Sequence, residues 1–299
     1  HSIMSGLCRQ SEVDEAALLV AYKDLEKRGI VREVSVGFVK YCSPTFLISR
    51  KTSTTKRPIA DLKRLNQFIV AVPFPLPELE CTLQEVGQGN QFSQVDLTLA
   101  YFSFGLTEQS QQFTCVRVGA SWYFTFTRLP MGGGSSPSIF MQQMDQIFGD
   151  LYGGGVFVYF DNIVISTKDN EQLHFELLEE VFHWIVDYNL VIRFVKCSFF
   201  ESNIVCFGWR LSDGMRAPSP TIRETFEKLK CLPTTKKHAV SALAALNYIS
   251  STVPGYSLMA ARWRTRLDSR KIIWTKDEAR DWPVFVEWVL ERSPYSESY

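Results

Sequence analysis

The stretch Val156-Phe157-Val158-Tyr159-Phe160-Asp161-Asn162-Ile163-Val164-Ile165 predicts a β-hairpin. Two runs of apolar, β-favouring residues flank a polar pair, which indicates a tight turn near Phe160 and Asp161. Hydrophobic strands would hold the Asp161 carboxylate at a fixed place at the tip, where it could bind a metal ion. The alternative is that Asp161 and Asn162 simply form the turn, because both residue types are common there.

Composition limits the classes of protein that this chain can represent. Its 299 residues are enough for a large domain or for two to three lobes, and 32 Lys and Arg balance 32 Asp and Glu. A net charge of zero gives no overall attraction to nucleic acid, although a basic groove can exist within it. We expect no membrane partner and an intracellular location, in the cytoplasm or nucleus, because no apolar run could span a bilayer and no signal peptide is recognisable. The seven cysteines are scattered, which predicts reduced thiols.

The segment from Arg50 to Arg57 carries four cations within eight residues, namely Arg50, Lys51, Lys56 and Arg57. It lies between two predicted strands, so we interpret it as a hairpin loop. Guanidinium and ammonium groups at such a tip suit a clamp on phosphates. A solvated loop with no ligand is the equally weighted alternative.

A second candidate acid is Asp96, at the end of a predicted strand over Phe92–Leu97. If this strand neighbours the Asp161 hairpin in one sheet, the two carboxylates meet at one edge. Two divalent cations held there would activate an attacking hydroxyl and stabilise a leaving pyrophosphate. Such cations prefer oxygen ligands, which Asp supplies and Cys does not.

Periodicity and capping residues predict the remaining elements. Ser11 and Asp14 form the capping pattern of a first helix. The glycine-rich Leu129–Pro137 loop could cradle phosphate but lacks the spacing of known phosphate loops. The other predicted elements are a helix over Ser138–Phe148, a helix over Glu171–Tyr188 with Leu173 on its inner face, a strand over Val205–Trp209, helices over Thr221–Leu232 and Lys237–Thr252, a strand over Ile272–Trp274 and a helix over Asp277–Leu290.

The order of these motifs resembles that of the reverse transcriptases of long-terminal-repeat retroelements, both gypsy-type and retroviral. The matching stretches cover almost the whole chain: Arg57-Pro58-Ile59-Ala60-Asp61 with Leu65-Asn66; Pro73-Phe74-Pro75-Leu76-Pro77; Gln94-Val95-Asp96-Leu97 with Ala100-Tyr101-Phe102; Leu129-Pro130-Met131-Gly132 with Ser136-Pro137 and Phe140; Tyr159-Phe160-Asp161-Asn162; Phe207-Gly208; Leu246-Asn247-Tyr248 with Val253-Pro254-Gly255; and Trp274-Thr275.

The resemblance implies an α+β fold of the right-hand polymerase type, with fingers, palm, thumb and the start of a connection. The implied boundaries are fingers over residues 1–71 and 104–135, palm over 72–103 and 136–213, thumb over 214–265, and the start of the connection or tether over 266–299. We expect no ribonuclease H domain within these residues.

The resemblance also implies roles for particular residues. Asp96 and Asp161 would be the catalytic ligands of Mg²⁺ or Mn²⁺, and Lys196 would protonate pyrophosphate. Tyr101 would lie under the sugar and exclude a 2′-hydroxyl, with plain core packing as the alternative for Tyr101 and Met131. The residues expected to bind the incoming nucleotide are Arg50, Lys51, Arg57, Leu97, Tyr101, Met131 and Gly132.

Asn162 departs from the family signature, which has two adjacent aspartates at the hairpin tip. An amide oxygen can coordinate a metal but brings no charge, so the site has two carboxylates instead of three. One unit charge about 4 Å from a cation contributes at most about 4 kcal/mol at an effective dielectric constant near 20. Losing a few kcal/mol slows a reaction by roughly 10²–10³. Natural divergence and deliberate substitution both fit Asn162.

Three hypotheses follow. The first, which we favour, is a degenerate and domesticated reverse-transcriptase-like protein that binds nucleic acid or a protein partner and polymerises weakly or not at all; the neutral net charge agrees with it. The second is an active RNA- and DNA-directed DNA polymerase that uses deoxynucleoside triphosphates and an RNA or DNA primer–template. The third is a purely structural subunit, for example of a dimer, that binds only protein.

Overall fold

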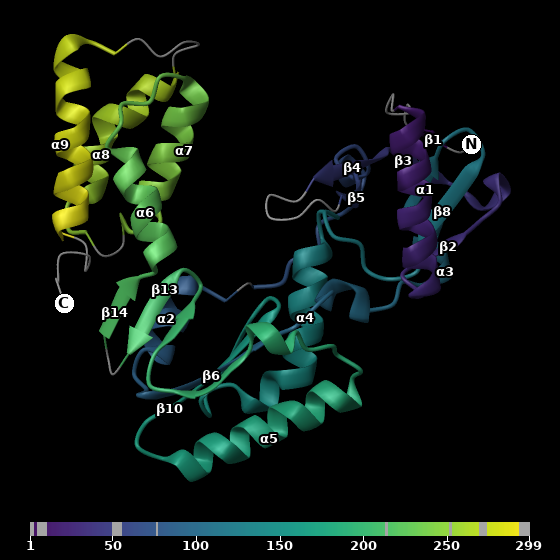
Figure 1. The fold of residues 1–299 in the computed structure, drawn as a ribbon, viewed down its shortest axis with the longest axis horizontal. Helices are drawn as coiled ribbons and strands as arrows, with labels where there is room; N and C mark the ends of the chain where they lie inside the picture. Colours follow the sequence, from purple (N-terminus) through teal and green to yellow (C-terminus); the bar gives the residue numbers. More distant parts are fainter. Residues whose placement is uncertain are drawn as a thin grey trace. The chain divides into compact units, whose positions relative to one another are not determined.

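A computed structural model describes residues 3–4, 11–49, 56–75, 77–212, 215–250, 253–268 and 274–292. The chain divides into two compact units (Figure 1). The first unit comprises residues 1–82, 93–165 and 170–199, and the second comprises residues 83–92, 166–169 and 200–299.

The first unit begins with a five-stranded sheet in the order β1-β3-β7-β8-β2. Its strands are β1 (Ile3–Met4), β2 (Val31–Glu33), β3 (Tyr41–Ser43), β7 (Cys115–Val118) and β8 (Trp122–Phe126). Helix α1 (Glu12–Lys27) packs against it, and the predicted cap is confirmed because Ser11 Oγ accepts a hydrogen bond from Asp14 N at 3.2 Å. Tyr22 of this helix is buried and stacks on Phe124 of β8, with ring centroids 5.3 Å apart.

Strands β4 (Thr45–Ser49) and β5 (Lys56–Ala60) pair antiparallel with Ser49 opposite Lys56. This pairing confirms the hairpin predicted around the cationic segment. Residues 50–55 lie outside the described part of the chain. The short helices α2 (Leu79–Val86) and α3 (Glu108–Gln111) were not predicted.

A four-stranded sheet in the order β11-β6-β10-β9 carries the two candidate acids. Its strands are β6 (Gln91–Asp96), β9 (Val156–Tyr159), β10 (Asn162–Thr167) and β11 (Ser198–Glu201). The predicted hairpin is confirmed, since Tyr159 pairs with Asn162 and leaves a two-residue loop. The Asp96 strand and the hairpin are neighbours in this sheet, as the predicted pairing of the two acids requires.

Helices α4 (Ser136–Phe148) and α5 (Glu171–Asp187) pack on this sheet and on each other (Figure 1). They bury Phe140 and Met144 from α4 and Val181 from α5. The prediction that Leu173 faces inward is wrong, because its side chain is 38% exposed. His174, the next residue, is buried instead, so the apolar face begins one position later than the leucine pattern indicates.

In the second unit, the predicted single strand over Val205–Trp209 is wrong. The chain forms a hairpin there, with β12 (Ile204–Cys206) paired to β13 (Trp209–Ser212) and β13 to β14 (Met215–Pro218). The turn consists of Phe207 and Gly208, both at positive φ, which a continuous strand does not tolerate. An apolar run on both sides of the turn concealed it.

In the part of the second unit that the structure describes, the hairpins are followed by helices α6 (Pro220–Leu229), α7 (Lys236–Asn247), α8 (Tyr256–Thr265) and α9 (Lys276–Arg292) (Figure 1). Trp263 of α8 and Trp282 of α9 are fully buried and meet edge to face, with centroids 5.1 Å apart. The Trp282 indole N–H donates to Leu229 O at 2.8 Å, which ties α9 to the end of α6. The helix predicted over Asp277–Leu290 is therefore confirmed, whereas Ile272 and Ile273 of the predicted strand lie outside the described residues.

No disulfide joins the six cysteines that the structure describes. Within the described helices, none is both long enough and apolar enough to cross a membrane.

Candidate functional site

The tip of the β9–β10 hairpin presents Asp161 on a strained turn. Phe160 has a φ of 54°, a conformation that costs a non-glycine residue of the order of 1–3 kcal/mol. Because only the first loop residue has a positive φ, the pattern is that of a type II′ hairpin turn. The Phe160 N–H donates to Met141 Sδ at 3.3 Å, so helix α4 supports the turn from below.

The structure brings Asp161 and Asp96 to one edge of the sheet. β6 lies beside β10, and the backbone N–H of Leu97, the residue after Asp96, donates to Asp161 O at 2.8 Å. This bond joins the end of β6 to the hairpin tip. The edge predicted from the two separate motifs is therefore formed.

Two cations surround the Asp96 carboxylate, whose side chain is 10% exposed. Lys196 Nζ lies 3.2 Å from Asp96 Oδ2, and Arg193 Nε lies 4.0 Å from Asp96 Oδ1. The Arg193 backbone N–H also donates to Asp96 O at 2.8 Å, and its guanidinium donates to Thr98 Oγ1 at 3.0 Å. Sequence reasoning placed Lys196 near the acids but missed Arg193, for which no local pattern exists.

Asn162 directs its amide oxygen at a neighbouring strand. Asn162 Oδ1 accepts a hydrogen bond from Gln94 Nε2 at 3.2 Å, while Asn162 Nδ2 lies 3.5 Å from Asp161 Oδ1. The oxygen that could coordinate a cation therefore already accepts one hydrogen bond, which leaves it one further acceptor position. The group that faces Asp161 is the amide nitrogen, which repels cations.

Tyr101 lies between the hydrophobic core and the acids. Its ring stacks on Phe140 with centroids 4.5 Å apart. Burial, and then the negative charge of Asp161, raise the pKa of the Tyr101 phenol. The side chain thus packs as the alternative interpretation expected, and it also feels the charge of the predicted metal site.

The side chains of Asn66 and Ser136 stabilise the Leu129–Pro137 loop through hydrogen bonds. Asn66 Nδ2 donates to Gly132 O at 3.0 Å, and Asn66 Oδ1 accepts from Gly134 N at 2.8 Å. Ser136 Oγ donates to Pro130 O at 2.8 Å. Met131 is 49% exposed at the loop tip, so core packing does not explain it.

The remaining predicted residues differ in accessibility. Arg57 is exposed on β5, whereas Leu97 is 2% exposed and its side chain belongs to the core. Leu97 can therefore offer only its backbone to a ligand. Arg50 and Lys51 lie outside the described residues.

The donor atoms at the sheet edge suit a hard divalent cation. Mg²⁺ is commonly held by one or two carboxylates together with water and substrate phosphates, which matches Asp96 and Asp161. Within the described parts of the chain, no group of three or more His, Cys, Asp or Glu side chains is placed to hold a metal. The residues thus fit a site of two carboxylates whose remaining ligands come from substrate and solvent.

Comparison with known proteins gives a family and several relatives. Residues 49–227 match the family described as reverse transcriptase (RNA-dependent DNA polymerase). Over 207 residues the chain is 27% identical to the retrovirus-related Pol polyprotein from transposon gypsy of Drosophila melanogaster, covering 67% of this chain and 20% of the relative. It is 31% identical over 180 residues to the corresponding polyprotein from transposon 412 of the same species, covering 58% and 14%. The chain therefore spans a small part of either polyprotein.

Solved structures of foamy viral protease-reverse transcriptase have a similar fold. One, in complex with an RNA/DNA hybrid, matches with a TM-score of 0.84 and 18% identity, over 98% of this chain and 39% of that chain. Another, in complex with double-stranded DNA, also matches with a TM-score of 0.84, over 97% of this chain and 50% of that chain.

Proposed function

Because the chain belongs to the reverse transcriptase (RNA-dependent DNA polymerase) family of long-terminal-repeat retroelements and has its right-hand polymerase fold, we propose that it binds a primer–template and extends it only slowly. Two carboxylates, Asp96 and Asp161, form its metal site. The observation that carries the proposal is the hydrogen bond from Gln94 to Asn162, which engages the side-chain oxygen of Asn162 that could assist a metal.

In this proposal the first unit and the β12–β13 hairpin supply fingers and palm, and β14 with helices α6 to α8 supplies the thumb. Asp96 and Asp161 would hold Mg²⁺ or Mn²⁺, and a bound ion would supply Lewis-acid stabilisation of an attacking primer hydroxyl and of the leaving pyrophosphate. Lys196 and Arg193, which already neutralise Asp96, are placed to turn toward phosphate. Met131 and Gly132 line the nucleotide pocket, and Tyr101 supports the sugar.

Asn162 explains why extension is slow. A third carboxylate would add one negative charge beside the metal site, which is worth up to about 4 kcal/mol at about 4 Å and an effective dielectric constant near 20. Part of that is lost to solvent screening, which leaves an expected deficit of roughly 10²–10³ in rate.

Binding of nucleic acid is supported by the similar structures, which are complexes with RNA/DNA hybrid and with double-stranded DNA. The net charge of this chain is zero, so binding would depend on local basic residues such as Arg57 and Lys56. Affinity of that kind falls steeply as salt concentration rises.

Primer extension tests the proposal. We would compare the unchanged chain with Asn162→Asp, Asp96→Ala and the matched control Asn203→Asp, on RNA and DNA templates with Mg²⁺ or Mn²⁺. Asn203 is exposed in a bend remote in sequence from either acid. We expect Asn162→Asp to raise the rate by about 10²–10³, Asn203→Asp to leave it unchanged and Asp96→Ala to abolish it.

A second candidate is an efficient polymerase with a two-aspartate site, which the intact constellation of Asp96, Tyr101 and Lys196 favours. Efficient extension by the unchanged chain, with less than a threefold gain from Asn162→Asp, would establish it and overturn the first proposal. A chain that binds no primer–template at low salt would overturn both.

A further inference from the structure

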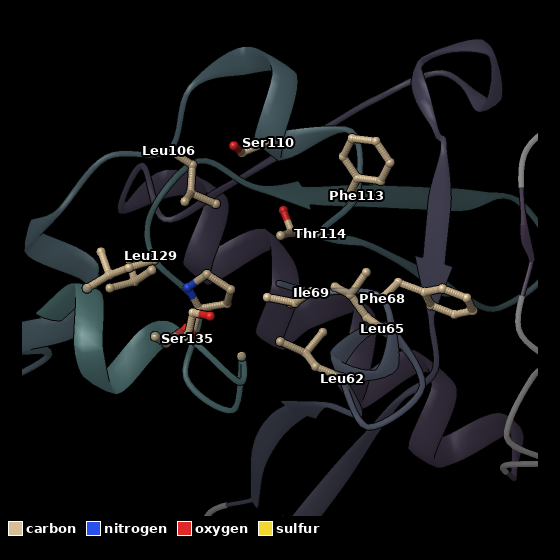
Figure 2. A pocket seen from close by; sticks show the side chains of 14 residues that line it. Leu62, Leu65, Phe68, Ile69, Leu106, Ser110, Phe113, Thr114, Leu129 and Ser135 are labelled. Carbon is tan, nitrogen blue, oxygen red and sulfur yellow. The ribbon is translucent and has the colours of Figure 1, made fainter. Parts of the chain in front are cut away.

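A pocket of about 390 Å³ lies in the first unit beneath the Leu129–Pro137 loop. Figure 2 shows Leu106 and Leu129 on one side of it, Phe68 and Phe113 on the other, and Ile69 between them. Its volume is within the range of about 300–1,000 Å³ that is typical of small-molecule sites.

The lining determines the chemical class of the ligand. None of the described residues that line the pocket carries a charge, which excludes a nucleotide or a metal ion as a favoured occupant. Phe68 and Phe113 are 66% and 41% exposed, so a flat ring placed between them would remove apolar surface from water.

Two hydroxyls of the pocket, those of Thr114 and Ser136, favour a ligand that donates a hydrogen bond. Thr114 Oγ1 donates to Gln111 O at 3.2 Å, and Ser136 Oγ donates to Pro130 O at 2.8 Å. Each hydroxyl has thus used its proton within the protein but keeps acceptor capacity. A ligand with one O–H group could donate to either oxygen.

The pocket shares its wall with the proposed nucleotide loop. Leu129, Pro130, Gly133, Ser135 and Ser136 line it, whereas Met131 and Gly132 between them do not. Pro130 and Gly133 are tied to Ser136, because Ser136 Oγ donates to Pro130 O at 2.8 Å and Ser136 N donates to Gly133 O at 3.0 Å. Met131 and Gly132 lie between these two anchored residues, so a ligand that displaces either one would also displace the loop tip.

We propose that this pocket binds an uncharged two-ring aromatic molecule with a single hydrogen-bond donor, and that its occupancy moves Met131 at the tip of the loop. The binding itself does not depend on whether the chain synthesises DNA. The consequence for nucleotide binding rests on the proposed function.

The probe is 2-naphthol, which is uncharged at neutral pH and has two fused rings and one O–H group. We would label the methionine methyl groups with ¹³C, assign the Met131 signal with Met131→Leu, and titrate the full chain with the probe. We expect a saturable shift of the Met131 methyl. Met259, which is similarly exposed on α8 (43% against 49%), serves as the internal control and stays unchanged.

Two variants locate the site. Leu106→Phe adds volume to the pocket, and Phe113→Ala removes one aromatic wall from its rim. We expect each to raise the dissociation constant at least tenfold. Leu258→Phe is the matched control, because it makes the same exchange at a side chain that is 82% exposed on α8. Circular dichroism before titration identifies a variant that fails to fold. If one of the two pocket variants does not fold, the dissociation constant of the other tests the site.

The outcomes separate the proposal from its alternatives. Saturable binding that both pocket variants weaken and Leu258→Phe preserves, with a shift of Met131, supports it. Binding that the variants leave unchanged, or the absence of saturation, overturns the site. Binding in the pocket without movement of Met131 overturns the coupling to the loop. None of these readouts uses DNA synthesis, so the failure of this proposal and that of the proposed function remain distinguishable.

Discussion

Among the hairpins whose turns the structure describes, β9–β10 and β12–β13 each turn over two residues and place a phenylalanine at a positive φ. In the β9–β10 hairpin the loop is Phe160–Asp161, with a φ of 54° at Phe160. In the β12–β13 hairpin the loop is Phe207–Gly208, with φ values of 50° and 80°. The first residue has nearly the same φ in both turns, but only the second turn has a positive φ at its second residue, which is the type I′ pattern. Their surroundings differ as well.

The Phe207–Gly208 turn is covered by its own unit. Tyr248, which follows α7, donates a hydrogen bond to Phe207 O and stacks on Trp209 with centroids 5.9 Å apart. Ser219 N donates to Gly208 O at 2.9 Å, which fixes the entry to α6. This turn therefore links the hairpin to the helices through hydrogen bonds and ring stacking.

The Phe160–Asp161 turn instead leaves its carboxylate exposed, beside Asp96 and Tyr101. Its second residue, Asp161, is not at a positive φ and needs no glycine, so the turn can carry a charge there while the strain falls on Phe160. The contrast indicates that a strained turn is kept where neighbouring residues stabilise it. Whether such a turn has a structural or a chemical role depends on the groups that it exposes.

The largest expected effect is on activity at the first turn. In the Asn162→Asp background, Asp161→Asn should slow primer extension by about 10³, because it removes a charge worth up to about 4 kcal/mol at the metal site. The free energy of unfolding should change by less than about 1 kcal/mol, because the side chain is exposed. Asp187→Asn, an exposed residue at the end of α5, is the matched control. A large loss of stability would show that this turn also has a structural role, as the Phe207–Gly208 turn does.

The next effect is on stability at the second turn. Gly208→Ala should lower the free energy of unfolding by about 2–4 kcal/mol, because φ is 80° and the added Cβ would lie 2.4 Å from Ile222 Cδ1. Gly255→Ala separates the two causes, since Gly255 has a φ of 79° and a Cβ added there would meet no atom within 4 Å. We expect it to cost about 1–2 kcal/mol in urea unfolding. An equal loss of unfolding free energy at both positions would show that contact between the added Cβ and Ile222 contributes nothing.

A smaller loss should follow from Tyr248→Phe, which removes the hydrogen bond to Phe207 O and keeps the ring. We expect the free energy of unfolding to fall by about 1–2 kcal/mol, because this hydrogen bond is lost. Tyr188→Phe, at a tyrosine that is 46% exposed, should change it by less than about 0.5 kcal/mol. Urea unfolding of both variants measures the difference. A Tyr248→Phe chain as stable as the control would contradict the claim that the Tyr248 hydrogen bond stabilises this turn.

The smallest expected effect is the stability cost of restoring charge at the first turn. Asn162→Asp should lower the free energy of unfolding by about 0.5–1 kcal/mol without divalent cations, because the introduced carboxylate repels that of the adjacent Asp161. Added Mg²⁺ should reverse the loss, since a ligand that binds only the folded state stabilises it. Thermal unfolding with and without Mg²⁺ checks this, and Asn203→Asp should show no Mg²⁺-dependent change. A gain in stability without Mg²⁺ would contradict the repulsion.

Local pattern predicted most of the secondary structure. Helix α1 follows its Ser11 cap, and the β9–β10 hairpin follows two apolar runs around Asp161. The elements that were missed have in common that their local sequence does not mark them. Gly208 allows a turn inside an apolar run, and α8 has too little amphipathic contrast to stand out before its Trp263 is seen buried.

The approach of Asp96 and Asp161 at one sheet edge was predicted, whereas the groups that form hydrogen bonds around them were not. Asp96 and Asp161 stand at recognisable positions, at a strand end and a hairpin tip. Arg193, Gln94 and Asn66 were not assigned their roles, because each acts through a hydrogen bond to a residue distant in the chain. The apolar pocket is likewise formed by three separate segments and has no signature in any of them.

Residue identity and short-range spacing were sufficient for the order of motifs, the family that they indicate and the number of carboxylates at the hairpin tip. The partners of those carboxylates came from the folded chain alone, because Lys196 neutralises Asp96 across 100 positions of sequence and Gln94 engages Asn162 across 68. A hydrogen bond depends on distance and direction in space, and folding sets both by packing strands and helices whose residues carry no local record of their partners.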